Sequence, residues 1–265
     1  MTASDIEEPP RPRTLAPLGR TVYEDPGVRR TLLSRVLGRA KMVRLYGTPI
    51  TCTFVKSADH SVTVFSKIRG QEVVGKYFLR TEIGRANLAA ERRSHELFGD
   101  RPWRMPVVKW HRQGFSVPRL SDGARLDVAS EKMTRDERLD ISATALDVLL
   151  EMYMAGYLHG DLQPHNIWLL EGRPVATDFE TSGPRTQGIP FLESGDITGH
   201  DPNPRRRKID TAFDPEDKWS FHYVLGVTLE QALETLRARL EQAGTPEARR
   251  KLAVLDGALP EQDEA

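Results

Sequence analysis

The chain has 265 residues, in which 38 lysines and arginines balance 38 aspartates and glutamates, and it contains one cysteine. This length allows one large domain or two small lobes. The zero net charge argues against a dedicated nucleic-acid-binding protein, which normally carries a basic excess. No apolar run approaches the roughly 20 residues that span a bilayer, no signal peptide is apparent, and one cysteine cannot form an internal disulfide. We therefore expect a cytoplasmic globular protein without a transmembrane segment; its oligomeric state stays open.

The first third of the chain predicts a leader, a helix and a sheet. Residues 1–27 are rich in proline and predict a flexible leader. Residues 28–37 have helical periodicity with a basic outer face. Strands rich in valine, threonine, isoleucine and phenylalanine are expected at 50–55, 61–68 and 71–79. Thr81 is then expected to cap a helix that runs to Phe98.

Two more strands are expected before the chain becomes mainly helical. They lie at 105–110 and 126–133, with a turn at 121–123. Apolar residues then repeat at helical spacing from Ile141 to Met152 and lead directly into His159. Further segments are an irregular stretch at 181–213, whose length is typical of a functional loop, a buried helix at 219–233 and an amphipathic segment at 236–242.

This order of elements predicts an α+β protein of two lobes with a site at the hinge between them. The expected boundaries are a leader at 1–27, an N-terminal lobe with a preceding helix at 28–133, a C-terminal lobe at 134–257 and a tail at 258–265.

The most informative motif begins at His159-Gly160-Asp161 and continues to Asn166. Two apolar runs with a glycine-containing turn at 171–173 then separate Asn166 from Asp178, which predicts a β-hairpin. A hairpin returns its two ends to nearly the same place. We therefore expect Asn166 and Asp178 to be neighbours that face Asp161.

These residue types suit phosphoryl transfer from ATP to a hydroxyl group. A carboxylate such as Asp161 can orient the attacking hydroxyl and accept its proton. Asn166 and Asp178 offer the oxygen ligands that Mg²⁺ prefers. Alternatively, Asp161 makes only a turn hydrogen bond, and Asn166 and Asp178 only cap the hairpin.

The motifs resemble the catalytic loop and metal-binding motif of the protein-kinase-like superfamily, in the form found among aminoglycoside-type phosphotransferases and compact atypical (Rio-like) kinases. The resemblance extends from about residue 48 to 233. It implies a two-lobed fold with an N-terminal antiparallel sheet that carries one helix, a reduced and mainly helical C-terminal lobe, and ATP and Mg²⁺ as cofactors.

The resemblance also implies roles for residues outside the motif. Lys76, on the third expected strand, would hold the ATP phosphates and be oriented by Glu91 of the next helix, with Lys67 as the rival lysine. Glu180 would bind a second metal, or it forms a salt bridge with an arginine. Glu131 and Met133 would contact adenine through their backbone groups, and Ser57 would help to hold the phosphates. His159 would have a structural role, and Asp217 would brace the catalytic loop or cap a helix.

The sequence differs from the protein-kinase pattern at positions that bear on which acceptor receives the phosphate. Gly160 stands in place of an arginine, Gln163 in place of a lysine, and no glycine-rich loop precedes Lys76. The basic run at 205–208 is either a solvated loop or a site for an anionic substrate. These features favour a small-molecule or glycan hydroxyl as acceptor. The alternative is a compact serine/threonine protein kinase, and a catalytically inactive scaffold is less favoured.

Overall fold

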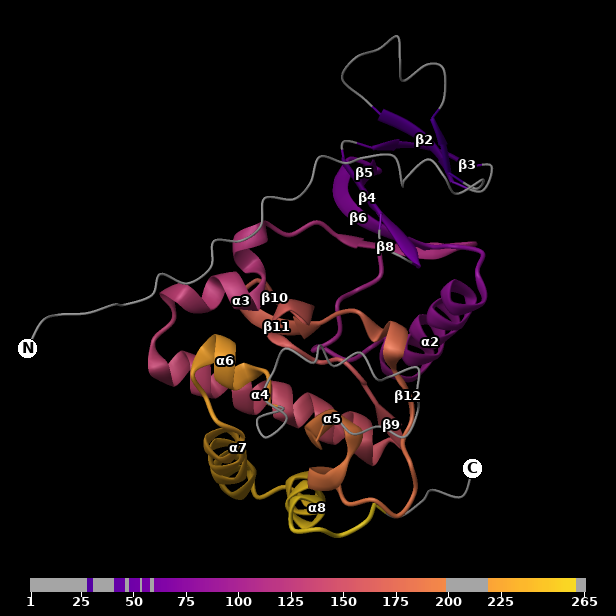
Figure 1. The fold of residues 1–265 in the computed structure, drawn as a ribbon. Coiled ribbons are helices and arrows are strands. Elements are labelled where there is room, and N and C mark those ends of the chain that lie inside the picture. The colour runs from indigo at the N-terminus through magenta and orange to yellow at the C-terminus, as the bar shows by residue number, and fades with distance from the viewer. Residues whose placement is uncertain are drawn as a thin grey trace, which may run out of the picture.

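The fold was obtained as a computed structural model (Figure 1). It describes residues 28–30, 41–45, 48–52, 54–57, 60–198 and 219–260, and for those before residue 60 it describes the backbone alone. The N-terminal part is built on antiparallel sheet and the C-terminal part is mainly helical. The chain is therefore a mixed α+β protein, as predicted.

The main sheet has five antiparallel strands in the order β4-β5-β6-β8-β7. These strands are β4 Phe54–Ser57, β5 Ser61–Ile68, β6 Gln71–Phe78, β7 Lys109–His111 and β8 Gly114–Pro118. The strands expected at 61–68 and 71–79 are confirmed, whereas the one expected at 50–55 is divided between β4 and its predecessor β3. A second sheet has the order β1-β2-β3 and consists of β1 Val28–Arg30, β2 Lys41–Leu45 and β3 Thr48–Cys52.

One long helix, α2 Glu82–Phe98, follows the main sheet, and its start was predicted correctly. The side chain of Thr81 accepts a hydrogen bond of 3.0 Å from the backbone of Gly84, which satisfies one of the free N–H groups of the first turn. Glu91 lies on the buried face of this helix.

Two predictions for the N-terminal part are wrong. The helix expected at 28–37 begins instead with the strand β1, because Val28–Arg30 pairs with β2. The strand expected at 126–133 is helical, with α3 Leu126–Ala129 followed by the 3-10 helix η3 Ser130–Lys132. Leu126 is fully buried but Val128 is 37% exposed, so the apolar alternation does not mark two faces of a strand.

The core of the C-terminal part surrounds α4 Arg135–Met154 (Figure 1). Thr134 and Glu137 form a capping box at its start, and the predicted stripe from Ile141 to Met152 is buried. The remaining elements are β9 Tyr157–Leu158, η4 Pro164–Asn166, β10 Ile167–Leu170, β11 Arg173–Ala176, η5 Phe179–Thr181, β12 Gly183–Pro184, η6 Phe191–Glu193, α5 Gly195–Thr198, α6 Phe221–Leu225, α7 Leu229–Ala243 and α8 Pro246–Leu255.

The single helix expected at 219–233 is in fact two helices. Gly226 adopts a left-handed conformation with φ 66° and ends α6. Thr228 then forms a new capping box with Gln231 at the start of α7. Both α6 and α7 still contribute fully buried residues to the core, so the expected burial is confirmed although the continuity is not.

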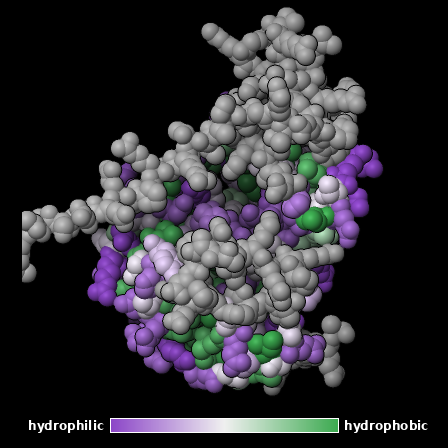
Figure 2. Space-filling view, in the orientation of Figure 1, coloured by the Kyte–Doolittle hydropathy of each residue, from purple (hydrophilic) through white to green (hydrophobic). Residues whose placement is uncertain are grey.

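The surface of the helical part mixes hydrophilic and hydrophobic residues on the face that Figure 2 shows. Within the described part of the chain, no helix is both long and apolar enough to cross a membrane.

Candidate functional site

The hairpin that was expected to build the site is present. Strands β10 and β11 pair antiparallel, with Ile167 opposite Ala176. Glu171 and Gly172 form the turn with φ values of 51° and 78°, which is typical of a two-residue turn with both residues left-handed. The backbone N–H and the hydroxyl of Thr177 both donate to the carbonyl of Asn166, at 2.8 and 2.9 Å. The hairpin thus brings the residue before Asp178 directly against Asn166.

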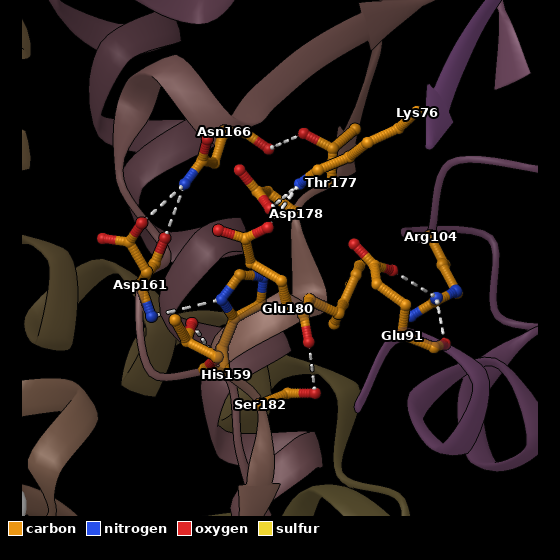
Figure 3. Close-up of polar contacts among 12 residues, drawn as sticks. Lys76, Glu91, Arg104, His159, Asp161, Asn166, Thr177, Asp178, Glu180 and Ser182 are labelled. Carbon is orange, nitrogen blue, oxygen red and sulfur yellow. Dashed lines mark hydrogen bonds and ion pairs between the residues drawn. The ribbon is translucent and has the colours of Figure 1, made fainter. Parts of the chain in front are cut away.

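Asp161 lies at the centre of a hydrogen-bond cluster (Figure 3). The amide of Asn166 donates to the carbonyl of Asp161 at 2.8 Å and to its carboxylate at 3.2 Å. The amide of Gln163 donates to the other carboxylate oxygen. Burial raises the pKa of Asp161 above its ordinary value, although the hydrogen bonds from Gln163 and Asn166 act in the opposite direction. A positioned carboxylate of raised pKa is well suited to accept a proton.

Lys76 joins the main sheet to the segment Asp178-Phe179-Glu180, which follows the hairpin. From β6 its ammonium forms ion pairs with Asp178 at 2.5 Å and with Glu180 at 2.9 Å. Burial disfavours the charged ammonium, but the attraction of Asp178, Glu180 and Glu91 is larger, so the pKa of Lys76 is raised. Burial acts to raise the pKa of Asp178, but the attraction and hydrogen bond of Lys76 together with the attraction of His159 and His165 outweigh it, so the pKa of Asp178 is lowered. Lys76 is therefore the lysine of this site; Lys67, the rival, pairs instead with Glu72 at the surface.

The expected pair of Lys76 with Glu91 is not formed. Within the described residues, the ion-pair partner of Glu91 is Arg104, whose guanidinium lies 3.5 Å from one carboxylate oxygen. The other oxygen of Glu91 has no hydrogen-bond partner among these residues. Burial raises the pKa of Glu91 to about 7, against the attraction of Lys76 and Arg104. Glu91 thus lies close enough to Lys76 to interact electrostatically but does not bind it, because Asp178 and Glu180 hold the ammonium.

Arg104 is a residue of this site that sequence reasoning missed. It is 4% exposed, and burial lowers its pKa to about 10 against the attraction of Glu91. An arginine is rarely buried unless it is paired. In the sequence it stands among other arginines, so no local pattern distinguishes it. Only the folded chain brings it against Glu91.

The backbone contacts with adenine predicted for Glu131 and Met133 assumed a strand, and these residues are not on a strand. Both were placed on a strand that would pass adenine, but η3 ends between them and Met133 packs against the core of the C-terminal part. The segment that leaves the main sheet starts instead at Arg119, directly after β8. Ser57 ends β4, and its side chain lies outside the described part of the chain.

The loop that carries Asp161 is braced from α5. The carboxylate of Asp196 accepts hydrogen bonds from the backbone N–H groups of His159 at 2.8 Å and Gly160 at 2.6 Å. This is the role expected of Asp217, which lies outside the described residues together with 205–208. His159 is fully buried against the ring of Phe179, with ring centres 4.5 Å apart, in keeping with its predicted structural role.

Gly160 cannot be replaced by a larger residue without rearrangement. Its φ is 83°, a conformation that L side chains rarely adopt, and an added Cβ would lie 2.9 Å from the carbonyl of Thr181. The arginine that protein kinases carry at this position therefore does not fit this loop.

The donors around Asp178 fit a Mg²⁺ ion by their chemistry. Asp178 and Glu180 offer carboxylate oxygens, and none of the described residues donates a hydrogen bond to the side-chain oxygen of Asn166. Hard oxygen ligands of this kind suit Mg²⁺, which keeps several waters and takes other ligands from phosphates. A group of three His, Cys, Asp or Glu side chains arranged to hold a metal is not found in the described part of the chain. A metal here would thus need the amide of Asn166 and substrate oxygens as well.

No protein-family model matches the sequence, and no curated protein matches it significantly. The case for a function therefore rests on the residues and geometry of the site.

Proposed function

We propose that the chain is an ATP- and Mg²⁺-dependent phosphotransferase with a protein-kinase-like fold, which transfers the γ-phosphate to a hydroxyl of a small molecule or glycan. The observation that carries this proposal is the cluster in which Asn166 binds Asp161 while Lys76 reaches Asp178 from the sheet. In kinases a lysine of the third strand contacts the phosphates, and an Asp and an Asn hold Mg²⁺ beside a catalytic Asp. Lys76 likewise lies on the third strand of the main sheet, counted from β4.

Each residue then has a chemical task. Asp161 accepts the proton of the acceptor hydroxyl, and Gln163 and Asn166 hold its carboxylate in place. Lys76 moves from Asp178 and Glu180 to the phosphate oxygens, which frees both carboxylates. Asp178 and Asn166 would hold Mg²⁺, with Glu180 as a further oxygen donor. When bound, Mg²⁺ supplies neutralisation of the charge on the transferring phosphoryl group.

Two observations favour a small acceptor over a protein substrate. Gly160 leaves no room for the arginine with which many protein kinases bind a phosphorylated activation loop. The neutral Gln163 binds the catalytic carboxylate rather than supplying a positive charge to the phosphate. The proposed transfer therefore takes place without these two features of protein kinases, which favours a small acceptor.

The deciding experiment is an ATP-consumption screen against hydroxylated metabolites and glycans, run beside labelled-phosphate transfer to proteins. We expect Mg²⁺-dependent turnover of a metabolite, and the Asp178→Ala substitution should abolish this turnover. Asp161→Asn should keep nucleotide binding but lower kcat by roughly 10²–10⁴-fold.

Asp147→Ala is the matched control for Asp178→Ala. Asp147 also pairs with a lysine, Lys251, at 2.7 Å, and its side chain is 34% exposed, as is that of Asp178. Asp147→Ala should leave turnover unchanged. Efficient phosphorylation of a protein with no turnover of any metabolite would support the compact protein kinase instead, and full activity of Asp178→Ala would contradict the proposal.

A further inference from the structure

Arg104 is held beside the strand that leads into the metal-binding motif. The backbone of its neighbours pairs with Ala176, since Met105 donates to the carbonyl of Ala176 at 3.0 Å and Ala176 donates to that of Trp103 at 2.6 Å. Ala176 precedes Asp178 by two residues. The backbone position of Arg104 is thus fixed relative to Asp178.

The side chain of Arg104 connects this strand to α2. Its guanidinium donates to the hydroxyl of Ser94 at 2.7 Å, to the carbonyl of Glu91 at 3.4 Å and to the carboxylate of Glu91 at 3.5 Å. The flat face of the same group lies 3.9 Å from the ring centre of Phe179, the residue between Asp178 and Glu180. One buried side chain therefore touches two turns of α2 and the middle residue of the segment 178–180. Figure 3 shows its contact with Glu91.

The charges around Arg104 give these contacts a consequence for Lys76. Glu91 is almost completely buried, and a buried carboxylate requires a cation or a proton. Arg104 supplies that cation by pairing with Glu91. Lys76 pairs instead with Asp178 and Glu180. Without Arg104, Glu91 would compete with Asp178 and Glu180 for the ammonium of Lys76, or take up a proton.

We propose that Arg104 is a positioning residue of the site, which holds the carboxylate of Glu91 and the ring of Phe179 together and so determines where Lys76, Asp178 and Glu180 stand. Arg104 contacts neither Lys76 nor Asp161 directly and acts through its neighbours. The inference rests on the proposed phosphotransferase function, because its effect is read in the use of Mg·ATP.

The test separates stability from activity with a pair of variants. Arg104→Met leaves Glu91 buried without its cation, so the unfolding midpoint should fall by roughly 5 °C or more and kcat/KM for Mg·ATP by about tenfold or more. Adding Glu91→Gln removes the unpaired charge. In the double variant the unfolding midpoint should recover substantially, but kcat/KM should stay low because the geometry is not restored.

Two further variants keep the test decisive. Lys251→Met is the matched control, since Lys251 is a 7% exposed cation that pairs with Asp147 between α8 and α4; it should lower the unfolding midpoint without changing kcat/KM. Arg104→Lys keeps the charge but not the planar fork, so it should fold and still lose about fivefold or more in kcat/KM. This variant provides the answer if Arg104→Met does not fold.

The possible results are distinct. Recovery of kcat/KM together with stability in the double variant, or wild-type kinetics in Arg104→Lys, would overturn the positioning role while leaving the phosphotransferase function intact. A wild-type protein that neither binds nor turns over Mg·ATP would overturn both proposals.

Discussion

Burial changes the acid–base properties of individual side chains in this site, and His159 shows the effect most simply. Burial lowers its pKa from 6.5 to about 4, with the attraction of Asp178 opposing and Arg104 adding to this shift. The unfolded chain therefore binds a proton at pH values where the folded protein does not. The stability that a neutral His159 provides is complete above pH 6.5 and is lost as the pH falls from 6.5 through 4.

We therefore predict that His159→Phe weakens the acid sensitivity of the fold. The loss in unfolding free energy between pH 7 and pH 4 should be smaller than in wild type by up to about 3 kcal/mol, measured by denaturant unfolding at several pH values. Glu91 has the opposite sign, because its raised pKa removes stability as the pH rises from 4.5 through 7. The same acid sensitivity in His159→Phe and wild type would contradict the assignment.

The residues whose proximity was predicted correctly from the sequence are those whose contacts are local. Asp161, Asn166 and Asp178 are linked by a short loop and a hairpin, and the spacing alone brings them together. The partners of Lys76 and Glu91 depend instead on contacts across the fold. Lys76 lies 102 residues before Asp178, and no local pattern could decide between Glu91 and Asp178 as its partner.

Secondary-structure elements were predictable where the pattern is regular or a cap is present. The strands β5 and β6 and the helix α4 follow their apolar spacing, and Thr81 marks the start of α2. The strand β8 was missed, because glycine and proline at its ends are poor strand formers. Gly114 has a physical reason to be there: a Cβ at this position would lie 2.0 Å from the carbonyl of Lys76.

The short helix α5 matters because the side chain of its Asp196 braces the loop that carries Asp161. Asp196→Ala would leave the backbone N–H groups of His159 and Gly160 without their acceptor. We predict a loss of about 1–3 kcal/mol in unfolding free energy, together with a drop in kcat and little change in KM for ATP. Thermal unfolding and steady-state kinetics measure the two effects. An unchanged kcat would show that the loop keeps its geometry without Asp196.

At the scale of the whole molecule, the site joins the sheet to the helical part of the chain. Lys76 comes from the main sheet, whereas Asp161 and Asp178 follow α4 and the hairpin. A ligand that contacts all three should stabilise both parts together. We predict that ATP with Mg²⁺ raises the unfolding midpoint, by an amount that corresponds to about 2.7 kcal/mol at 100 times the dissociation constant.

Thermal unfolding with Mg²⁺ alone, ATP alone and both together measures this effect. The combined addition should exceed the sum of the two, and Asp178→Ala should remove the excess. A full shift with ATP alone would contradict the role of Asp178 and Asn166 as metal ligands.

The ammonium of Lys76 between Asp178 and Glu180 has a further consequence for the order of binding. Because it is attached to the chain, it competes with dissolved cations as an intramolecular ligand at high effective concentration. A free Mg²⁺ ion has to displace it without offering it a new partner, whereas the Mg·ATP complex brings phosphate oxygens to which the ammonium can move. We therefore expect the protein to accept metal and nucleotide as one preassembled substrate.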